Sequence, residues 1–253
     1  MSQVAPETNA HSATAPARRL RSLATEAVRH LAAHDDIVGV RLVGSVARGD
    51  ARPDSDIDLL VIATKRLARS TLLQRLPAAL CEENWSFLVY TDTAWLRDAQ
   101  EGSLFIEHVR LEGETLYDAN RVLDEGLEAL ARRGPDPSAD LQRRLRQVRL
   151  YRDPARLNGQ HLFALSHLYA IGKAVAIARC AQLGKTTFVK DDALRSVAEL
   201  RPEVSAEAEI ISRLRPFYDR TGGRDSGRVP FEPVNAEAEI QRAIAAIQRL
   251  ADG

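Results

Sequence analysis

Two aspartates, Asp56 and Asp58, stand two positions apart where an apolar run, 59–63, begins. Residues two apart on a β-strand project from the same face, so the two carboxylates are expected side by side. Adjacent carboxylates repel each other unless a cation neutralises them, and hard oxygen ligands of this kind suit Mg²⁺. The pair therefore predicts a metal site at the opening of a buried strand.

A Gly-Ser pair, Gly44 and Ser45, directly follows a predicted strand over 37–43 that is rich in β-branched residues. Glycine lets the backbone approach a ligand closely, and the serine hydroxyl can meet a phosphate oxygen. A helical turn is expected next; it presents backbone N–H donors to an anion and carries Arg48 one turn on. A phosphate cradle beside a dicarboxylate metal site is what in-line phosphoryl transfer requires.

Two simpler interpretations of the acidic segment compete with a metal site for phosphoryl transfer. A solvated Asp-rich turn is disfavoured because the carboxylates enter an apolar strand instead of leaving one. An EF-hand calcium loop starting at Asp54 fails because its sixth position is Leu59 instead of glycine and its twelfth is Lys65 instead of glutamate.

The segment 44–61, GSVARGDARPDSDIDLLV, closely resembles the nucleotidyltransferase-fold superfamily named after DNA polymerase β. A weaker match, EGETLYD at 112–118, is similar to the end of this domain in small bacterial members. The resemblance implies that Asp56 and Asp58 are catalytic and hold two Mg²⁺ ions. It also implies that the nucleotide is bound by Gly44, Ser45, Arg48 and Ser55.

One residue of the family pattern is missing from this sequence. The family usually carries a third carboxylate on the next strand, where it helps to activate the attacking hydroxyl. That strand is predicted over 85–91, and the aligned position holds Ser86. The nearby carboxylates that could substitute are Glu82, Glu83 and Asp92. Otherwise the acceptor supplies its own base, or the enzyme is slow or inactive.

Apolar periodicity predicts an α/β nucleotidyltransferase domain, a small mixed sheet with helices, followed by an all-α helical bundle. The expected divisions are a disordered leader over 1–17, the nucleotidyltransferase domain over 18–120, a connecting helix and linker over 121–138, and the α-helical domain over 139–253. Strands are predicted over 37–43, 56–63, 85–91 and 114–117. Helices are predicted over 18–34, 67–83, 94–99, 104–111, 141–151, 161–183, 191–200, 207–218 and 236–250, with an aperiodic loop over 221–233.

The composition is ordinary, with 28% charged residues and a net charge of +0. Without a global basic excess, nucleic acid is not indicated as a partner, although a local basic groove stays open. The two distant cysteines are expected to be reduced, which fits the cytoplasm. No stretch reaches the roughly 18 consecutive apolar residues of a membrane span, so no membrane partner is expected.

The resemblance implies an enzyme that moves a nucleoside monophosphate, with AMP as the expected group, from an NTP to a hydroxyl of a small molecule or a protein. Pyrophosphate is released, and the helical domain completes an acceptor site, as in aminoglycoside nucleotidyltransferases, or forms a homodimer interface. The alternative is a weakly active or inactive nucleotide-binding or toxin–antitoxin interaction module with a HEPN-like helical domain.

Two features of the helical half are compatible with nucleic-acid chemistry. Arg156 and His161 have the R-x₄-H spacing of HEPN ribonucleases, although the start of a helix is the favoured interpretation. A basic run is expected to be a solvated helix face, with a contact to nucleotide or RNA as the alternative. Its members are Arg143, Arg144, Arg146, Arg149 and Arg152.

Overall fold

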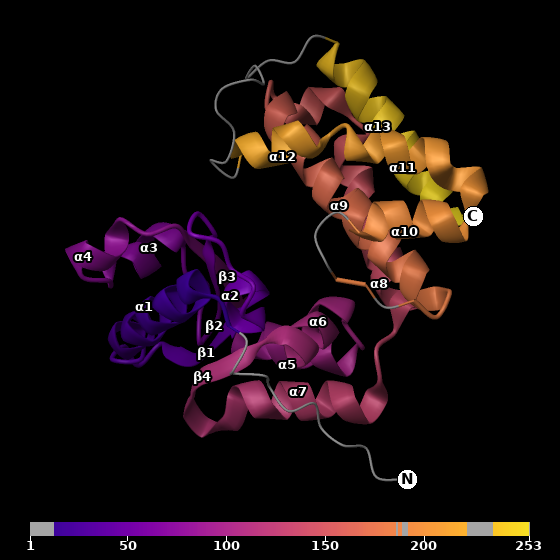
Figure 1. Ribbon diagram of the computed structural model, residues 1–253. Helices are drawn as coiled ribbons and strands as arrows, with labels where there is room; N and C mark the ends of the chain where they lie inside the picture. Colours follow the sequence, from indigo (N-terminus) through magenta and orange to yellow (C-terminus); the bar gives the residue numbers. More distant parts are fainter. Residues whose placement is uncertain (1–12, 186, 189–191, 222–234, 253) are drawn as a thin grey trace. The chain divides into compact units, whose positions relative to one another are not determined.

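The computed structural model describes residues 13–185, 187–188, 192–221 and 235–252 (Figure 1). The chain divides into two compact units, Met1–Pro135 and Asp136–Gly253. The first is a mixed sheet with helices and the second is helical, so the predicted fold class is confirmed. The predicted loop over 221–233 lies, except for its first residue, outside the described residues.

The first unit contains a sheet of four strands in the order β3-β2-β1-β4. β1 (Ile37–Val43) runs antiparallel to both of its neighbours, β2 (Ile57–Ala63) and β4 (Glu114–Asp118). β3 (Trp85–Thr91) runs parallel to β2 and forms one edge of the sheet. The interior position of β2 explains its continuous apolar run, because both of its faces must be covered.

Three helices contribute the apolar layer on one face of the sheet. α1 (Ala15–Leu31) packs there together with the short helices α3 (Arg69–Gln74) and α4 (Ala78–Cys81). Their side chains meet the alternate residues Leu59 and Val61 of β2, both fully buried. The alternation of the strand therefore directs one set of apolar side chains to this layer.

The other face is covered by α5 (Asp92–Gln100), α6 (Leu104–Glu112) and α7 (Val122–Arg133) (Figure 1). Leu60 and Ile62 of β2 belong to this second layer. Every residue of β2 except Asp58 is therefore buried in one of the two apolar layers.

α7 belongs to the first unit, whereas a connecting helix and linker were predicted over 121–138. It packs so closely on α5 that a Cβ at Gly126 would lie 2.1 Å from Nε1 of Trp95. The first unit therefore continues past the predicted end at residue 120, as far as Pro135. The sequence did not indicate this packing, because the contact requires a glycine in the middle of a helix. Glycine at such a position has a low helix propensity and so argues against a helix.

Two predicted helices differ from the observed ones at prolines. α1 begins at Ala15 instead of 18, because Thr14 caps it by accepting a hydrogen bond from the Ala17 N–H and Pro16 fits its first turn. Residues 15–17 of the predicted leader thus belong to α1, and residues 1–12 lie outside the described residues. The helix predicted over 67–83 is divided into α3 and α4 before Pro77, which cannot continue a helix.

The second unit is built around α9 (His161–Gln182), which contacts α8 (Pro137–Val148), α10 (Asp192–Leu200) and α13 (Ala236–Asp252). By length and composition α9 could cross a membrane, but 61% of its apolar window is buried inside the protein, as in a core helix. The helix predicted over 207–218 is divided into α11 (Ser205–Ser212) and α12 (Arg215–Thr221).

An ion pair fixes the start of the sheet to the segment after α3. Asp36 accepts hydrogen bonds from both terminal nitrogens of Arg75, at 2.7 and 2.8 Å, and Lys65 Nζ lies 3.3 Å away. The Arg75 hydrogen bonds lower the pKa of Asp36 from 3.8 to about 2, against the effect of burial. Both paired side chains are 14% exposed, so water screens the pair only in part.

Asp36→Asn is expected to lower the free energy of unfolding by about 1–2 kcal/mol at pH 7. Because the pKa of Asp36 is depressed in the folded state, its contribution is present above pH 3.8 and is lost as the pH falls towards about 2. The difference in the free energy of unfolding between variant and wild type should therefore become smaller as the pH falls over that range. Urea unfolding across the pH range measures it, with Asp35→Asn as the exposed neighbouring control; an equal loss in both variants contradicts the assignment.

Candidate active site

The turn at the end of β1 brings the Gly-Ser pair against the second aspartate. The chain passes from Val43 directly into α2 (Gly44–Arg48), and Gly44 has a φ of +73°. A Cβ at Gly44 would lie 2.4 Å from Oδ2 of Asp58. Glycine is required here both by the left-handed backbone and by the carboxylate beside it. The structure therefore brings together the predicted phosphate turn and the predicted metal ligand.

The two aspartates occupy the start of β2. Asp56, the first residue of the strand predicted over 56–63, immediately precedes the observed strand, and Asp58 is the second residue of β2. Both are half-buried, whereas Ile57 between them is fully buried. This alternation is what two side chains on one face of a strand produce.

Ser86 stands beside Asp58 in the sheet. The parallel register of β2 and β3 pairs these two residues, so a serine occupies the neighbouring position on the same face. Among the described residues, no group of three His, Cys, Asp or Glu side chains is arranged to hold a metal ion. Within the described part of the chain, the aspartate pair is therefore not joined by another His, Cys, Asp or Glu side chain in a metal-binding arrangement.

The proposed substitutes for a third carboxylate are not equivalent. Asp92 follows the far end of β3, six residues beyond Ser86, which is about 20 Å along the strand. Glu83 is ion-paired with Arg19 of α1, and Glu82 is an exposed residue after α4. Asp92 thus lies at the end of β3 that is far from Asp58. The ion pair of Glu83 holds it to α1.

Arg48 is held by acidic neighbours. Its Nη1 lies 2.7 Å from Oε2 of Glu112, the last residue of α6, and its Nη2 lies 3.5 Å from Asp50. His108 Nε2 shares the same Glu112 oxygen at 3.0 Å. Burial lowers the pKa of Arg48, but the hydrogen bonds and negative charges of Glu112 and Asp50 together outweigh burial, and the pKa is raised. The guanidinium is therefore charged and fixed beside α2; sequence reasoning did not find these partners.

Three hydrogen bonds fix the loop between α2 and β2. The Ser55 hydroxyl accepts from the Arg52 N–H at 2.9 Å, so it closes the turn before the aspartates. Thr14 donates its N–H to the Gly49 carbonyl at 3.0 Å and its hydroxyl to the Ala51 carbonyl at 2.8 Å. The N-terminal cap of α1 thus also holds the loop between α2 and β2, a role that no local pattern around Thr14 indicates.

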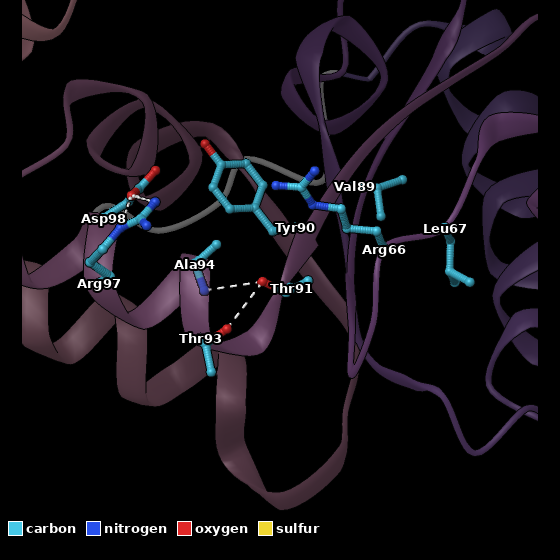
Figure 2. Close-up of a pocket in the computed structure, with 9 residues that line it drawn as sticks. All are labelled: Arg66, Leu67, Val89, Tyr90, Thr91, Thr93, Ala94, Arg97 and Asp98. Carbon is cyan, nitrogen blue, oxygen red and sulfur yellow. Dashed lines mark hydrogen bonds and ion pairs between the residues drawn. The ribbon is translucent and has the colours of Figure 1, made fainter.

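A pocket of about 640 Å³ lies at the opposite, carboxyl end of β2 and β3 (Figure 2). Figure 2 shows the Arg97–Asp98 pair and the Thr91 hydroxyl, which accepts a hydrogen bond from the Ala94 N–H at 3.2 Å. The lining residues are Arg66, Leu67, Val89, Tyr90, Thr91, Thr93, Ala94, Arg97 and Asp98. Since Asp58 and Ser86 lie at the other end of these strands, this pocket is separate from the aspartate pair.

Residues 23–111, which contain α2, the aspartate pair and β3, match the family model described as a nucleotidyltransferase domain. This part of the chain is a nucleotidyltransferase domain. The match supports nucleotide binding and transfer of a nucleoside monophosphate from an NTP in general. It ends in α6, before the helix that completes the first unit.

Solved structures similar to the chain include the three that follow, and no curated protein matches it significantly. A toxin–antitoxin structure with AMP-PNP is 21% identical over 43% of this chain and 85% of the other, with a TM-score of 0.34. Spectinomycin adenyltransferase AAD(9) from Enterococcus faecialis, solved with ATP and spectinomycin, is 13% identical over 91% and 99%, with a TM-score of 0.45. A nucleotidyltransferase-like protein from Exiguobacterium sibiricum 255-15 is 17% identical over 93% and 74%, with a TM-score of 0.29.

Gly44→Ala is expected to lower nucleotidyl transfer on the order of 100-fold, because the new methyl group displaces the Asp58 carboxylate. Gly134→Ala is the control: its φ of +81° is also one that disfavours a side chain, but nothing lies within 4 Å of the added Cβ. Initial rates and thermal unfolding of both variants separate the two effects. Equal activity losses would show that strain alone, and not the Asp58 contact, limits the nucleotidyltransferase domain.

Proposed function

We propose that the chain is a Mg²⁺-dependent nucleotidyltransferase that transfers a nucleoside monophosphate, AMP in the first instance, from an NTP and releases pyrophosphate. The observation that carries the proposal is the approach of Gly44 to the Asp58 carboxylate within a nucleotidyltransferase domain. In this proposal the turn at Gly44 binds phosphate and lies beside the dicarboxylate pair. Phosphoryl transfer requires both at one place.

The two aspartates fit a magnesium site that is completed by the nucleotide. Mg²⁺ in such sites is held by one or two carboxylates together with substrate phosphates and waters, so a pair of half-buried carboxylates suffices. Asp56 and Asp58 would hold the metal, and two ions are expected from the family. When bound, Mg²⁺ neutralises phosphate charge and polarises the reacting oxygens.

The remaining groups bind and orient the triphosphate. Gly44 and Ser45 lie at the turn, where a backbone N–H and a hydroxyl can donate to phosphate oxygens. Arg48, kept charged by Glu112, adds positive charge one turn away. The Ser55 hydroxyl is hydrogen-bonded to the Arg52 N–H inside the loop, so we assign Ser55 a positioning role instead of a direct nucleotide contact.

In the proposed reaction an acceptor oxygen attacks the α-phosphorus in line. A new bond from that oxygen to phosphorus forms, the bond between the α-phosphorus and the bridging oxygen breaks, and pyrophosphate leaves with the bonding electrons. The acceptor is a hydroxyl of a small molecule or a protein, and its proton must pass to a base. Ser86, the residue next to Asp58, is not such a base at neutral pH.

Ser86 also favours a second candidate, a weakly active or inactive nucleotide-binding module that acts in a toxin–antitoxin interaction. Incubation of the chain with labelled ATP, CTP, GTP or UTP and Mg²⁺ separates the two. Pyrophosphate release with transfer of label supports the enzyme. Nucleotide binding without release supports the module, and no binding of any NTP overturns both.

We further infer that the protein works in the cytoplasm with an NTP and its acceptor as partners. Both cysteines, the exposed Cys81 and the buried Cys180, are free thiols, which agrees with a reducing compartment. A homodimer stays a prediction.

Arg156 is ion-paired with Asp153 at 3.2 Å, and no described contact joins it to His161, so we do not assign a ribonuclease role to this spacing.

A further inference from the structure

Two arginines of the second unit carry positive charge without a counterion. The side chains of Arg149 and Arg152, in the turn that follows α8, make no hydrogen bond or ion pair with any residue that the structure describes. Other arginines of the same unit do: Arg143 lies 2.8 Å from Asp140 and Arg213 lies 3.1 Å from Glu209. The turn thus concentrates positive charge in a protein whose net charge is +0.

These arginines line a pocket of about 380 Å³ between the turn and the last turns of α13. Arg249 of α13 is a third guanidinium in the lining, held by Glu207 at 3.2 Å, and Asp252 is the only acidic residue there. The other lining residues are Leu145, Ala245 and Gln248. Three cations around one small pocket, against one carboxylate, create a local potential that attracts anions.

The same turn contributes its middle residues to a second pocket, of about 430 Å³, on α9. Leu150 and Phe163 are large apolar residues of this lining, yet they are 64% and 57% exposed. Beside them the Tyr151 hydroxyl is hydrogen-bonded to His167 Nδ1 at 2.6 Å, with the rings at 79°. Exposed apolar side chains of this size, gathered at one pocket, are typical of a binding surface.

We propose that this basic-aromatic surface, defined by Arg149, Arg152, Leu150 and Phe163, binds single-stranded nucleic acid. The arginines would contact backbone phosphates, and the exposed ring of Phe163 would stack on an unpaired base. A small anion would use only the basic pocket, and a duplex does not offer its base faces for stacking. The combination therefore selects an unpaired strand, and it does not depend on the nucleotidyltransferase activity.

The test is fluorescence anisotropy of the full chain with a labelled 12-nucleotide oligo(U) RNA, its DNA counterpart and a duplex of equal length. We expect both single strands to bind, the duplex to bind more weakly, and affinity to fall as NaCl rises. The double variant Arg149→Ala with Arg152→Ala should weaken binding at least about 10-fold and lower the salt slope by about two. Phe163→Ala should weaken binding about 10-fold without changing that slope.

Arg213→Ala, which removes an exposed arginine elsewhere in the unit, is the charge control and should bind as the wild type does. Circular dichroism and thermal unfolding establish that each variant is folded. Absence of binding to both single strands overturns the proposal. Three other results also overturn it: unchanged affinity in Phe163→Ala, tighter binding of the duplex than of the single strands, or an equal loss of affinity in the Arg213 variant. Each of these results would show only a general attraction to a polyanion.

Discussion

Asp56→Asn and Asp58→Asn are each expected to abolish nucleotidyl transfer while leaving the fold intact. An asparagine amide keeps the shape of the side chain but carries no charge to hold a divalent cation against the phosphates. A metal contribution of several kcal/mol to the transition state is then lost, and a loss of about 4 kcal/mol corresponds to a rate about 1000-fold lower. The measurement is pyrophosphate release from labelled NTP at saturating Mg²⁺.

Asp54→Asn provides the matched control, because Asp54 is an exposed aspartate of the same loop two residues earlier. It should retain the wild-type rate, and thermal unfolding should be similar in all three variants. Titration of nucleotide in the presence and absence of Mg²⁺ adds a second readout, since only the wild type and the control should bind more tightly with the metal. Wild-type turnover in the Asp58 variant would remove the basis for the proposed function.

The elements that hold the site could be predicted because their signals are local. β1 and β3 have the bounds that their β-branched and aromatic runs predict, 37–43 and 85–91. The proximity of Gly44 and Asp58 follows from the antiparallel pairing of β1 and β2, whose register sets Val43 opposite Asp58. Two strands that follow each other in the sequence and pair in an antiparallel sheet bring such residues together.

Contacts between distant segments could not be predicted from these local patterns. The Arg48–Glu112 ion pair joins residues 64 positions apart, and Thr14 holds a loop 37 residues away. The assignment of α7 to the first unit depends on the fit of Trp95 against Gly126. In each case the role of the residue depends on a partner that is distant in the sequence. Such a partner becomes a neighbour only in the folded chain.

Ser86 is the position where a single substitution should increase activity. The register sets it beside Asp58 on the same face of the sheet, where a carboxylate could take the proton of an acceptor hydroxyl. General-base catalysis contributes about 100- to 10,000-fold in enzymes, and a carboxylate introduced without further adjustment should recover part of it. Ser86→Asp is therefore expected to raise the rate of pyrophosphate release with glycerol as acceptor at least about 10-fold.

Ser86→Asn separates the charge of the new side chain from its size, because asparagine has the shape of aspartate without its basicity. A gain in the aspartate variant alone, lost again when Asp58→Asn is added, assigns catalysis to three carboxylates acting together. If neither variant gains activity although both bind nucleotide, the proton is removed by the acceptor itself. In that case the native serine is not a defect, because the substrate of this nucleotidyltransferase domain carries its own base.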